Sequence, residues 1–127
     1  MSNITMTFDH EGNCTNVDEL NRAIKTKDCA IKYDDNKLRW HLMPFDALIQ
    51  IQQVLDDGAD KYGERNWEKG FNYQRLFSAT MRHLLAWIRG VDNDLESGHP
   101  HLAHATANLL FLLAFQIRKT GVDDRGK

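Results

Sequence analysis

The chain has 127 residues, 42% of them apolar, which suits one domain whose core needs no disulfides. A formal net charge of −2 and scattered lysines and arginines argue against a broad surface for long nucleic acids. The longest apolar run, residues 107–115, is broken by Asn108 and is too short to span a bilayer, and the polar N-terminus lacks a signal-peptide layout. We therefore expect a soluble, cytoplasmic protein that does not bind membranes.

Residues 1–31 are polar and weakly patterned, and we predict an N-terminal arm that could hold a short helix over residues 18–24. Cys14 and Cys29 lie far apart without a CxxC pattern, so we interpret them as ordinary thiols of a reducing compartment. Residues 32–42 follow as an extended segment that leads into the first long helix.

Three helices are predicted next, over about residues 44–61, 72–90 and 100–119, because apolar side chains recur there with a helical period. Residues suited to helix starts precede the patterns and glycines follow them: Pro44, Asn72 and Pro100, then Gly63, Gly90 and Gly121. Residues 121–127 are predicted to form a frayed tail, which leaves residues 32–120 as one helical domain.

The third predicted helix, over residues 100–119, is apolar on nearly every face after its first two turns. Such a helix is buried on all sides or lines a subunit interface. The sequence therefore predicts an all-α fold, a small helical bundle of three long helices. It also predicts a homodimer or higher homo-oligomer with the third helix near the symmetry axis.

Acidic and histidine side chains are concentrated just before and within the third helix. They are Asp92, Asp94, Glu96, His99, His101 and His104. His101 and His104 share one helix face with Asn108, and free N–H groups at the helix start suit a phosphate. Carboxylates beside imidazoles can bind a divalent metal or perform acid–base chemistry. The alternative is a solvated loop with histidines that pack the helix, but a polar line on an apolar helix needs partners.

The second predicted helix carries Arg82, His83 and Trp87. His83 could meet the face of His101 and His104 across the helix pair. A nucleotide would give Arg82 a phosphate partner and Trp87 a base on which to stack. The alternative is a core tryptophan, a histidine with its hydrogen bonds satisfied and a surface arginine.

Two further segments combine cations with aromatic side chains. The segment DKYGERNW supplies Lys61, Tyr62, Arg65, Asn66 and Trp67 around a glycine turn, and KYDDNKLRW supplies Lys37 and Arg39. Either could contact phosphates or a base, although the second segment alone is also typical of a solvated strand. The sequence has no GxxxxGK[ST], GxGxxG, GxSxG or HExxH motif.

Taken in chain order, these segments resemble the small phage and prophage proteins related to dATP/dGTP diphosphohydrolases. The motifs are K-x-D-x-x-K at 32–37, L-x-P at 42–44, G-A-x-K-Y-G-x-x-N-W-x-x-G at 58–70, R-H-L-x-A-W at 82–87 and D-x-E-S-G-x-x-H-L-x-H-A at 94–105. Such proteins are similar to all-α NTP pyrophosphohydrolases of the MazG type. The resemblance implies Mg²⁺-dependent cleavage of a (d)NTP to the monophosphate and pyrophosphate, in a phage-infected or prophage-carrying bacterium.

MazG-type sites hold their metals with helical ExxE and ExxD pairs, which the second and third predicted helices lack. The nearest such spacing joins Asp57 and Asp60 on the first helix.

The leading hypothesis is a metal-dependent diphosphohydrolase that acts on a purine (d)NTP. Its residues would have four roles. Asp94 and Glu96 would bind Mg²⁺ or Mn²⁺ or orient the attacking water, and His83, His101 and His104 would act in catalysis. The phosphates would be neutralised by Lys37, Lys61 and Arg82. Trp67 or Trp87 would stack on the base, and the further contacts would be Arg39, Tyr62, Asn66 and Asn108.

The main alternative is a non-catalytic phage protein that sequesters a nucleotide or a nucleotide-derived signalling molecule. The missing ExxE pair favours this alternative, whereas the pair of Asp94 and Glu96 beside three histidines favours the enzyme. A third alternative is a purely structural or partner-binding helical protein, and the polar line on the third helix argues against it.

Overall fold

The computed structural model describes residues 6–8, 14–16 and 29–126, and the chain divides into two units, Met1–Arg39 and Trp40–Lys127. In the first unit, β1 (Met6–Phe8) pairs antiparallel with β2 (Cys14–Asn16). Cys29 is disulfide-bonded, so the expectation of two free thiols is wrong, because spacing along the chain does not report proximity in the fold. The short helix predicted over residues 18–24 lies outside the described residues.

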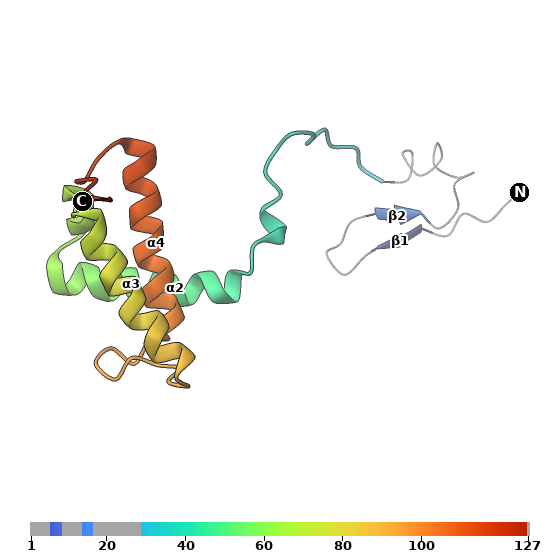
Figure 1. Cartoon of the computed structure of the whole chain (residues 1–127). Helices are drawn as coiled ribbons and strands as arrows, with labels where there is room; N and C mark the ends of the chain where they lie inside the picture. The colour runs from blue at the N-terminus through green and yellow to red at the C-terminus, as the bar shows by residue number, and fades with distance from the viewer. Residues whose placement is uncertain (1–5, 9–13, 17–28, 127) are drawn as a thin grey trace, which may run out of the picture. The chain divides into compact units, whose positions relative to one another are not determined.

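The second unit contains the 3-10 helix η2 (Trp40–Leu42) and three long helices, α2 (Phe45–Tyr62), α3 (Tyr73–Ile88) and α4 (His101–Arg118). A second 3-10 helix, η3 (Asn66–Lys69), joins α2 to α3 (Figure 1). The all-α prediction is confirmed. Among the described helices, none is long and apolar enough to cross a membrane.

Helices α3 and α4 lie side by side, and α2 contacts α4 (Figure 1). The core is aromatic and lies at the end where α3 begins and α4 ends, around Tyr73, Leu76 and Phe115. Trp67 of η3 covers this core and stacks on Phe111, with ring centroids 4.8 Å apart. The connection between α2 and α3 is therefore fixed against α4, and it helps to form one wall of the cleft described below.

The C-terminal residues fold back onto the start of α3, so the prediction of a frayed tail is wrong. Gly121 adopts a φ of +74°, and Val122 exchanges two backbone hydrogen bonds with the segment that leads into α3. Asp124 Oδ1 then accepts a 2.9 Å hydrogen bond from the backbone N–H of Gln74. This carboxylate satisfies a helix N-terminus that the side chain of Asn72 leaves uncapped.

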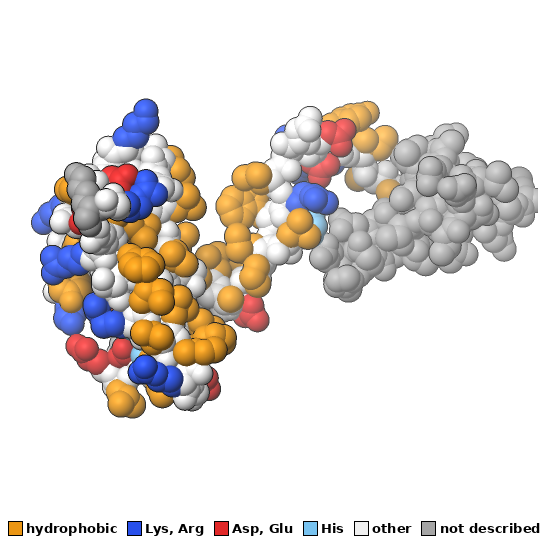
Figure 2. Space-filling model, in the orientation of Figure 1, with side chains coloured by type: hydrophobic (Ala, Val, Ile, Leu, Met, Phe, Trp, Pro, Cys, Tyr) orange, Lys and Arg blue, Asp and Glu red, His pale blue; other side chains and the backbone are white. Residues whose placement is uncertain are grey.

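A stripe of large apolar side chains stays exposed on the helical unit. Figure 2 shows hydrophobic side chains gathered on one face of that unit. We define the stripe by these exposed apolar residues of α3 and α4: Phe77, Met81, Leu85 and Ile88, then Leu102, Leu109, Leu110, Leu113 and Ile117. Apart from the adjacent pair Leu109 and Leu110, successive members are three, four or seven residues apart, which is the amphipathic pattern of a surface that packs against something.

Candidate functional site

Asp94 organises the loop between α3 and α4. Its Oδ1 accepts hydrogen bonds from the backbone N–H groups of Glu96 and Ser97, at 2.8 and 3.0 Å. Its own backbone groups bond to His99 and Gly98, which closes the turn. The hydrogen bond from Ser97 is the main cause that lowers the pKa of Asp94, so this carboxyl group is ionised at neutral pH.

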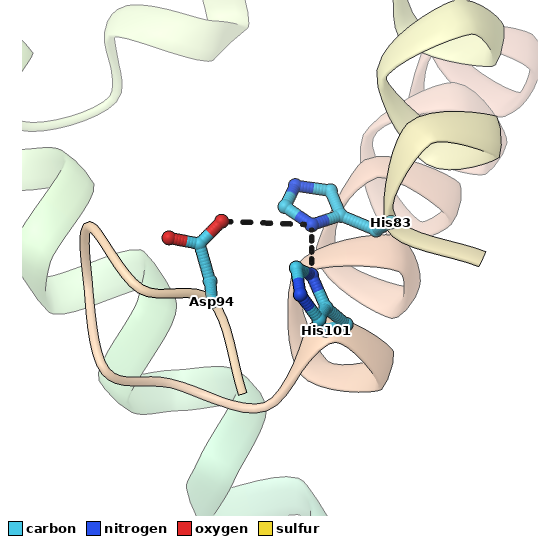
Figure 3. A group of neighbouring side chains, drawn as sticks. All are labelled: His83, Asp94 and His101. Carbon is cyan, nitrogen blue, oxygen red and sulfur yellow. Dashed lines mark hydrogen bonds and ion pairs between the residues drawn. The ribbon is translucent and has the colours of Figure 1, made fainter. Parts of the chain in front are cut away.

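Three elements bring Asp94 together with two histidines (Figure 3). His83 projects from α3, and His101 is the first residue of α4, only 8% exposed. Their Nδ1 atoms lie 2.9 Å apart, and Asp94 Oδ2 lies 3.9 Å from Nδ1 of His83. The structure thus joins residues that the sequence analysis singled out in two separate segments.

His104 extends this cluster toward α2. Its ring stacks on that of His83, with centroids 4.6 Å apart and planes 5° apart. Its Nε2 lies 2.7 Å from the hydroxyl oxygen of Ser97, which also accepts a bond from the backbone N–H of His99. His99 in turn pairs with Asp57 on α2. The loop therefore connects all three long helices.

Burial lowers the pKa of both His83 and His104, because an imidazolium loses hydration inside the cluster. Neighbouring histidines lower the pKa of each ring further, whereas the charge of Asp94 opposes the shift. Both rings are therefore neutral at pH 7. A neutral imidazole can accept a proton or bind a metal.

Stability should fall when the pH drops below about 6.5, the ordinary pKa of histidine. Below that pH the two histidines take up protons in the unfolded chain but remain neutral in the folded protein, because folding lowers the pKa of His83 and His104. The stabilisation present above that pH is therefore lost as the pH falls through the lowered pKa values of the folded state. Urea unfolding followed by circular dichroism between about pH 7.5 and about pH 5.5 measures this effect. His104→Gln should flatten the dependence. A flat profile in the parent protein would contradict the assignment.

A cleft of about 940 Å³ opens beside this cluster, between α2, η3, α3, α4 and the loop. Nine of the predicted site residues line it: Lys61, Tyr62, Asn66, Trp67, His83, Asp94, Glu96, His104 and Asn108. A cleft of this size is in the range of small-molecule sites. His101 does not line the cleft, but its Nδ1 lies 2.9 Å from Nδ1 of His83.

Four predicted residues lie elsewhere. Arg82 and Trp87 are exposed on α3 and do not line the cleft. Lys37 and Arg39 belong to the first unit, so their role toward a nucleotide stays a prediction. The N–H groups expected to be free at the start of α4 are partly used, because His101 donates its N–H to the carbonyl of Asp92 at 2.8 Å.

Asp57, Arg75 and Ser97 also line the cleft, although none of them was assigned a role from the sequence. Ser97 stands in the D-x-E-S-G motif, which was a usable signal. The only sequence signal for a functional role of Asp57 was its spacing from Asp60, and Arg75 had no signal beyond its charge.

The cations and carboxylates of the cleft are mostly at its exposed rim. Lys61 of α2 lies 3.5 Å from the carboxylate of Glu96, and both side chains are largely exposed. Such a pair contributes little to stability, so Lys61 is available to an incoming anion. Arg75 also lines the cleft, and its guanidinium lies 6.0 Å from the ring of Phe71.

Mg²⁺, which the resemblance implies, takes about six oxygen ligands and favours carboxylates and water. Glu96 turns toward Lys61, whereas Asp94 has one oxygen bound by the loop and the other beside His83. The donors that converge on Asp94 are imidazole nitrogens. This set fits Mg²⁺ poorly, and the assignment of Asp94 and Glu96 as joint metal ligands stays a prediction.

Comparison with known proteins agrees with the motifs. Residues 28–125 match the family described as dATP/dGTP diphosphohydrolase, N-terminal. A protein of Salmonella phage PMBT28 named dATP/dGTP diphosphohydrolase is 35% identical over 95 residues, which make up 75% of this chain and 32% of that protein. The chain thus spans about a third of the length of this curated relative. No solved structure matches it. The chain belongs to the family of dATP/dGTP diphosphohydrolase N-terminal domains.

Proposed function

We propose that this chain binds a purine (d)NTP in the cleft between α2 and α4 and cleaves it to the monophosphate and pyrophosphate. The observation that carries the proposal is the composition of the cleft. Exposed cations, Lys61 and Arg75, stand beside an ionised carboxylate, Asp94, and a neutral imidazole, His104. The name of the phage relative supports the same reaction and a purine deoxynucleotide as substrate.

The triphosphate would lie along the rim of the cleft. Lys61 and Arg75 come from different helices and line the same cleft, so they can contact successive phosphates of one chain. Their charges would counter the negative charge that gathers on the leaving pyrophosphate. Tyr62, next to Lys61 and also in the lining, offers a ring to the base, whereas Trp67 is already stacked on Phe111.

His104 would act as the general base. The attacking water forms a bond to phosphorus while the bond to pyrophosphate breaks, and the proton of the water goes to the imidazole, directly or through the hydroxyl of Ser97. Ser97 lies 2.7 Å from Nε2 of His104 and also accepts a hydrogen bond from the loop, which fixes it in place. Asp94 would stabilise the imidazolium, because its charge favours the protonated form of His104.

Equilibrium binding of dGTP and dATP to Lys61→Ala tests the location of the phosphates. Loss of a charge-assisted contact of about 1.5–3 kcal/mol should weaken binding by about one to two orders of magnitude. Lys69→Ala is the matched control, since Lys69 is an exposed lysine of η3 outside the cleft lining. Equal effects of the two variants would place the nucleotide elsewhere.

Retention without turnover is the second candidate function. This candidate is favoured because the three carboxylates around the histidine cluster each already have an interaction partner. Asp57 pairs with His99, Glu96 lies beside Lys61, and Asp94 is held by the loop. A protein that only sequesters a nucleotide needs the cations and the aromatic ring but no free carboxylate.

We also propose that the chain forms a homodimer or higher homo-oligomer through the exposed stripe of α3 and α4. Leu113, in the middle of that stripe, is more than half exposed. Leu113→Lys should reduce the mass measured by light scattering to that of a monomer, because a lysine cannot be buried unpaired in an apolar interface. The same change at Leu95, a loop residue outside the stripe, should leave the mass unchanged. A monomeric parent at micromolar concentration would refute this proposal.

A further inference from the structure

Three side chains at the cleft, two of them in its lining, present their ligand atoms to one another. One ring nitrogen of His83, one ring nitrogen of His101 and one carboxylate oxygen of Asp94 all lie within 4.8 Å of one another. They come from α3, from the start of α4 and from the loop between these helices, so the fold assembles the group (Figure 3). The two imidazoles are shielded, since His101 is buried and His83 is half-buried.

The spacing of these atoms suits a shared metal ion. With bonds of about 2.0–2.1 Å, two nitrogen ligands are about 2.9 Å apart at a right angle and about 3.3 Å apart in a tetrahedron. The two Nδ1 atoms lie 2.9 Å apart. Asp94 Oδ2 lies 3.9 Å from Nδ1 of His83, so a small rotation of one side chain brings it into range.

The loop also aims the carboxylate. Both hydrogen bonds from the loop backbone go to Oδ1 of Asp94, whereas Oδ2 faces His83. When hydrogen bonds fix one oxygen of a carboxylate, the other oxygen keeps a fixed orientation. Hydrogen-bonding groups around metal sites orient the metal ligands in the same way. The backbone N–H of His101 donates to the carbonyl of Asp92, which ties the second imidazole to the same loop.

We propose that His83, Asp94 and His101 bind one divalent transition-metal ion. Two imidazoles with one carboxylate are the ligands of Zn²⁺, Fe²⁺, Co²⁺ and Ni²⁺ sites, whereas Mg²⁺ prefers oxygen alone. Three protein ligands leave at least one coordination position for water or for an oxygen of a ligand. This site does not depend on the proposed hydrolysis, because it also suits a protein that only retains a nucleotide.

Titration of the chelator-treated full chain with Co²⁺, in the absence of nucleotide, tests the site directly. We expect one equivalent to bind per chain, with visible absorption bands of a nitrogen and oxygen ligand field. Asp94→Asn and His83→Gln should each weaken Co²⁺ binding at least as much as the roughly 10–100-fold that loss of a supporting group causes. Asn at position 94 retains the oxygen that accepts the loop hydrogen bonds, so this variant keeps the fold if His83→Gln does not.

His99→Gln is the matched control, because His99 pairs with Asp57 and lies outside the group of three. It should bind Co²⁺ as the parent does, and millimolar Mg²⁺ should leave the Co²⁺ spectrum unchanged. The proposal is overturned if binding is absent, if Mg²⁺ displaces Co²⁺, or if His99→Gln weakens binding as much as Asp94→Asn. If binding is absent, His83 and His101 share a hydrogen bond only.

Discussion

Asp94→Asn is expected to lower turnover of a purine deoxynucleoside triphosphate by about 10²–10⁴-fold, the range for loss of an acid–base contribution. The amide removes the charge that favours protonated His104, so the proposed general base holds the proton of the attacking water less well. The fold should survive, because Asn retains an oxygen for the N–H groups of Glu96 and Ser97. Initial rates measured by chromatographic separation of the products, with circular dichroism of both proteins, give the comparison.

Asp92→Asn makes the same change two residues earlier in the loop, at an exposed side chain outside the cleft lining, and should leave the rate unchanged. Equal losses in the two variants would contradict the role given to Asp94. If the parent has no turnover and Asp94→Asn binds the nucleotide equally well or more tightly, the second candidate function holds. Removal of a negative charge near phosphates then explains tighter binding.

Phe115→Ala is expected to cost about 3–5 kcal/mol of unfolding free energy, the usual cost of removing a buried phenylalanine ring. Phe115 is 0% exposed, and the rings of Trp67 and Tyr73 lie 6.1 and 6.2 Å from it, centroid to centroid. Removal of the Phe115 ring leaves a cavity where η3, α3 and α4 meet. Since small domains are stable by about 5–15 kcal/mol, urea unfolding should show a large shift of the midpoint.

Leu95→Ala is the control for this stability measurement, because its side chain is 98% exposed, and it should change the free energy by less than about 0.5 kcal/mol. Phe115→Leu should fall between the two. A loss below about 1 kcal/mol for Phe115→Ala would show that this aromatic cluster is not the core of the unit.

The long helices could be predicted from local pattern alone. Apolar periodicity and the residues Pro44, Asn72 and Pro100 placed each start within one residue of the observed one. The return of the C-terminal residues could not be predicted, because it depends on hydrogen bonds between Val122 and the start of α3, about fifty residues earlier in the chain. A short polar segment after a helix gives no sign of a partner that is distant in the sequence.

The histidine cluster was predictable in part. His101 and His104 are three residues apart, which places them near each other on α4, and the shared face of two packed helices explains the approach of His83. The pair of Asp57 and His99 depends on how α2 packs, which periodicity does not encode. The outward position of Arg82 is explained by helix geometry. Adjacent residues of a helix point about 100° apart, so Arg82 turns to solvent when His83 faces inward.

The central claim is that the cleft turns over its nucleotide, and product analysis tests it most directly. The parent protein is incubated with dGTP or dATP and a divalent metal, and the nucleotides and phosphates are then separated by chromatography. The account predicts the deoxynucleoside monophosphate and pyrophosphate in equal amounts, with loss of both in Asp94→Asn. Recovery of intact triphosphate that remains bound to the protein would contradict it.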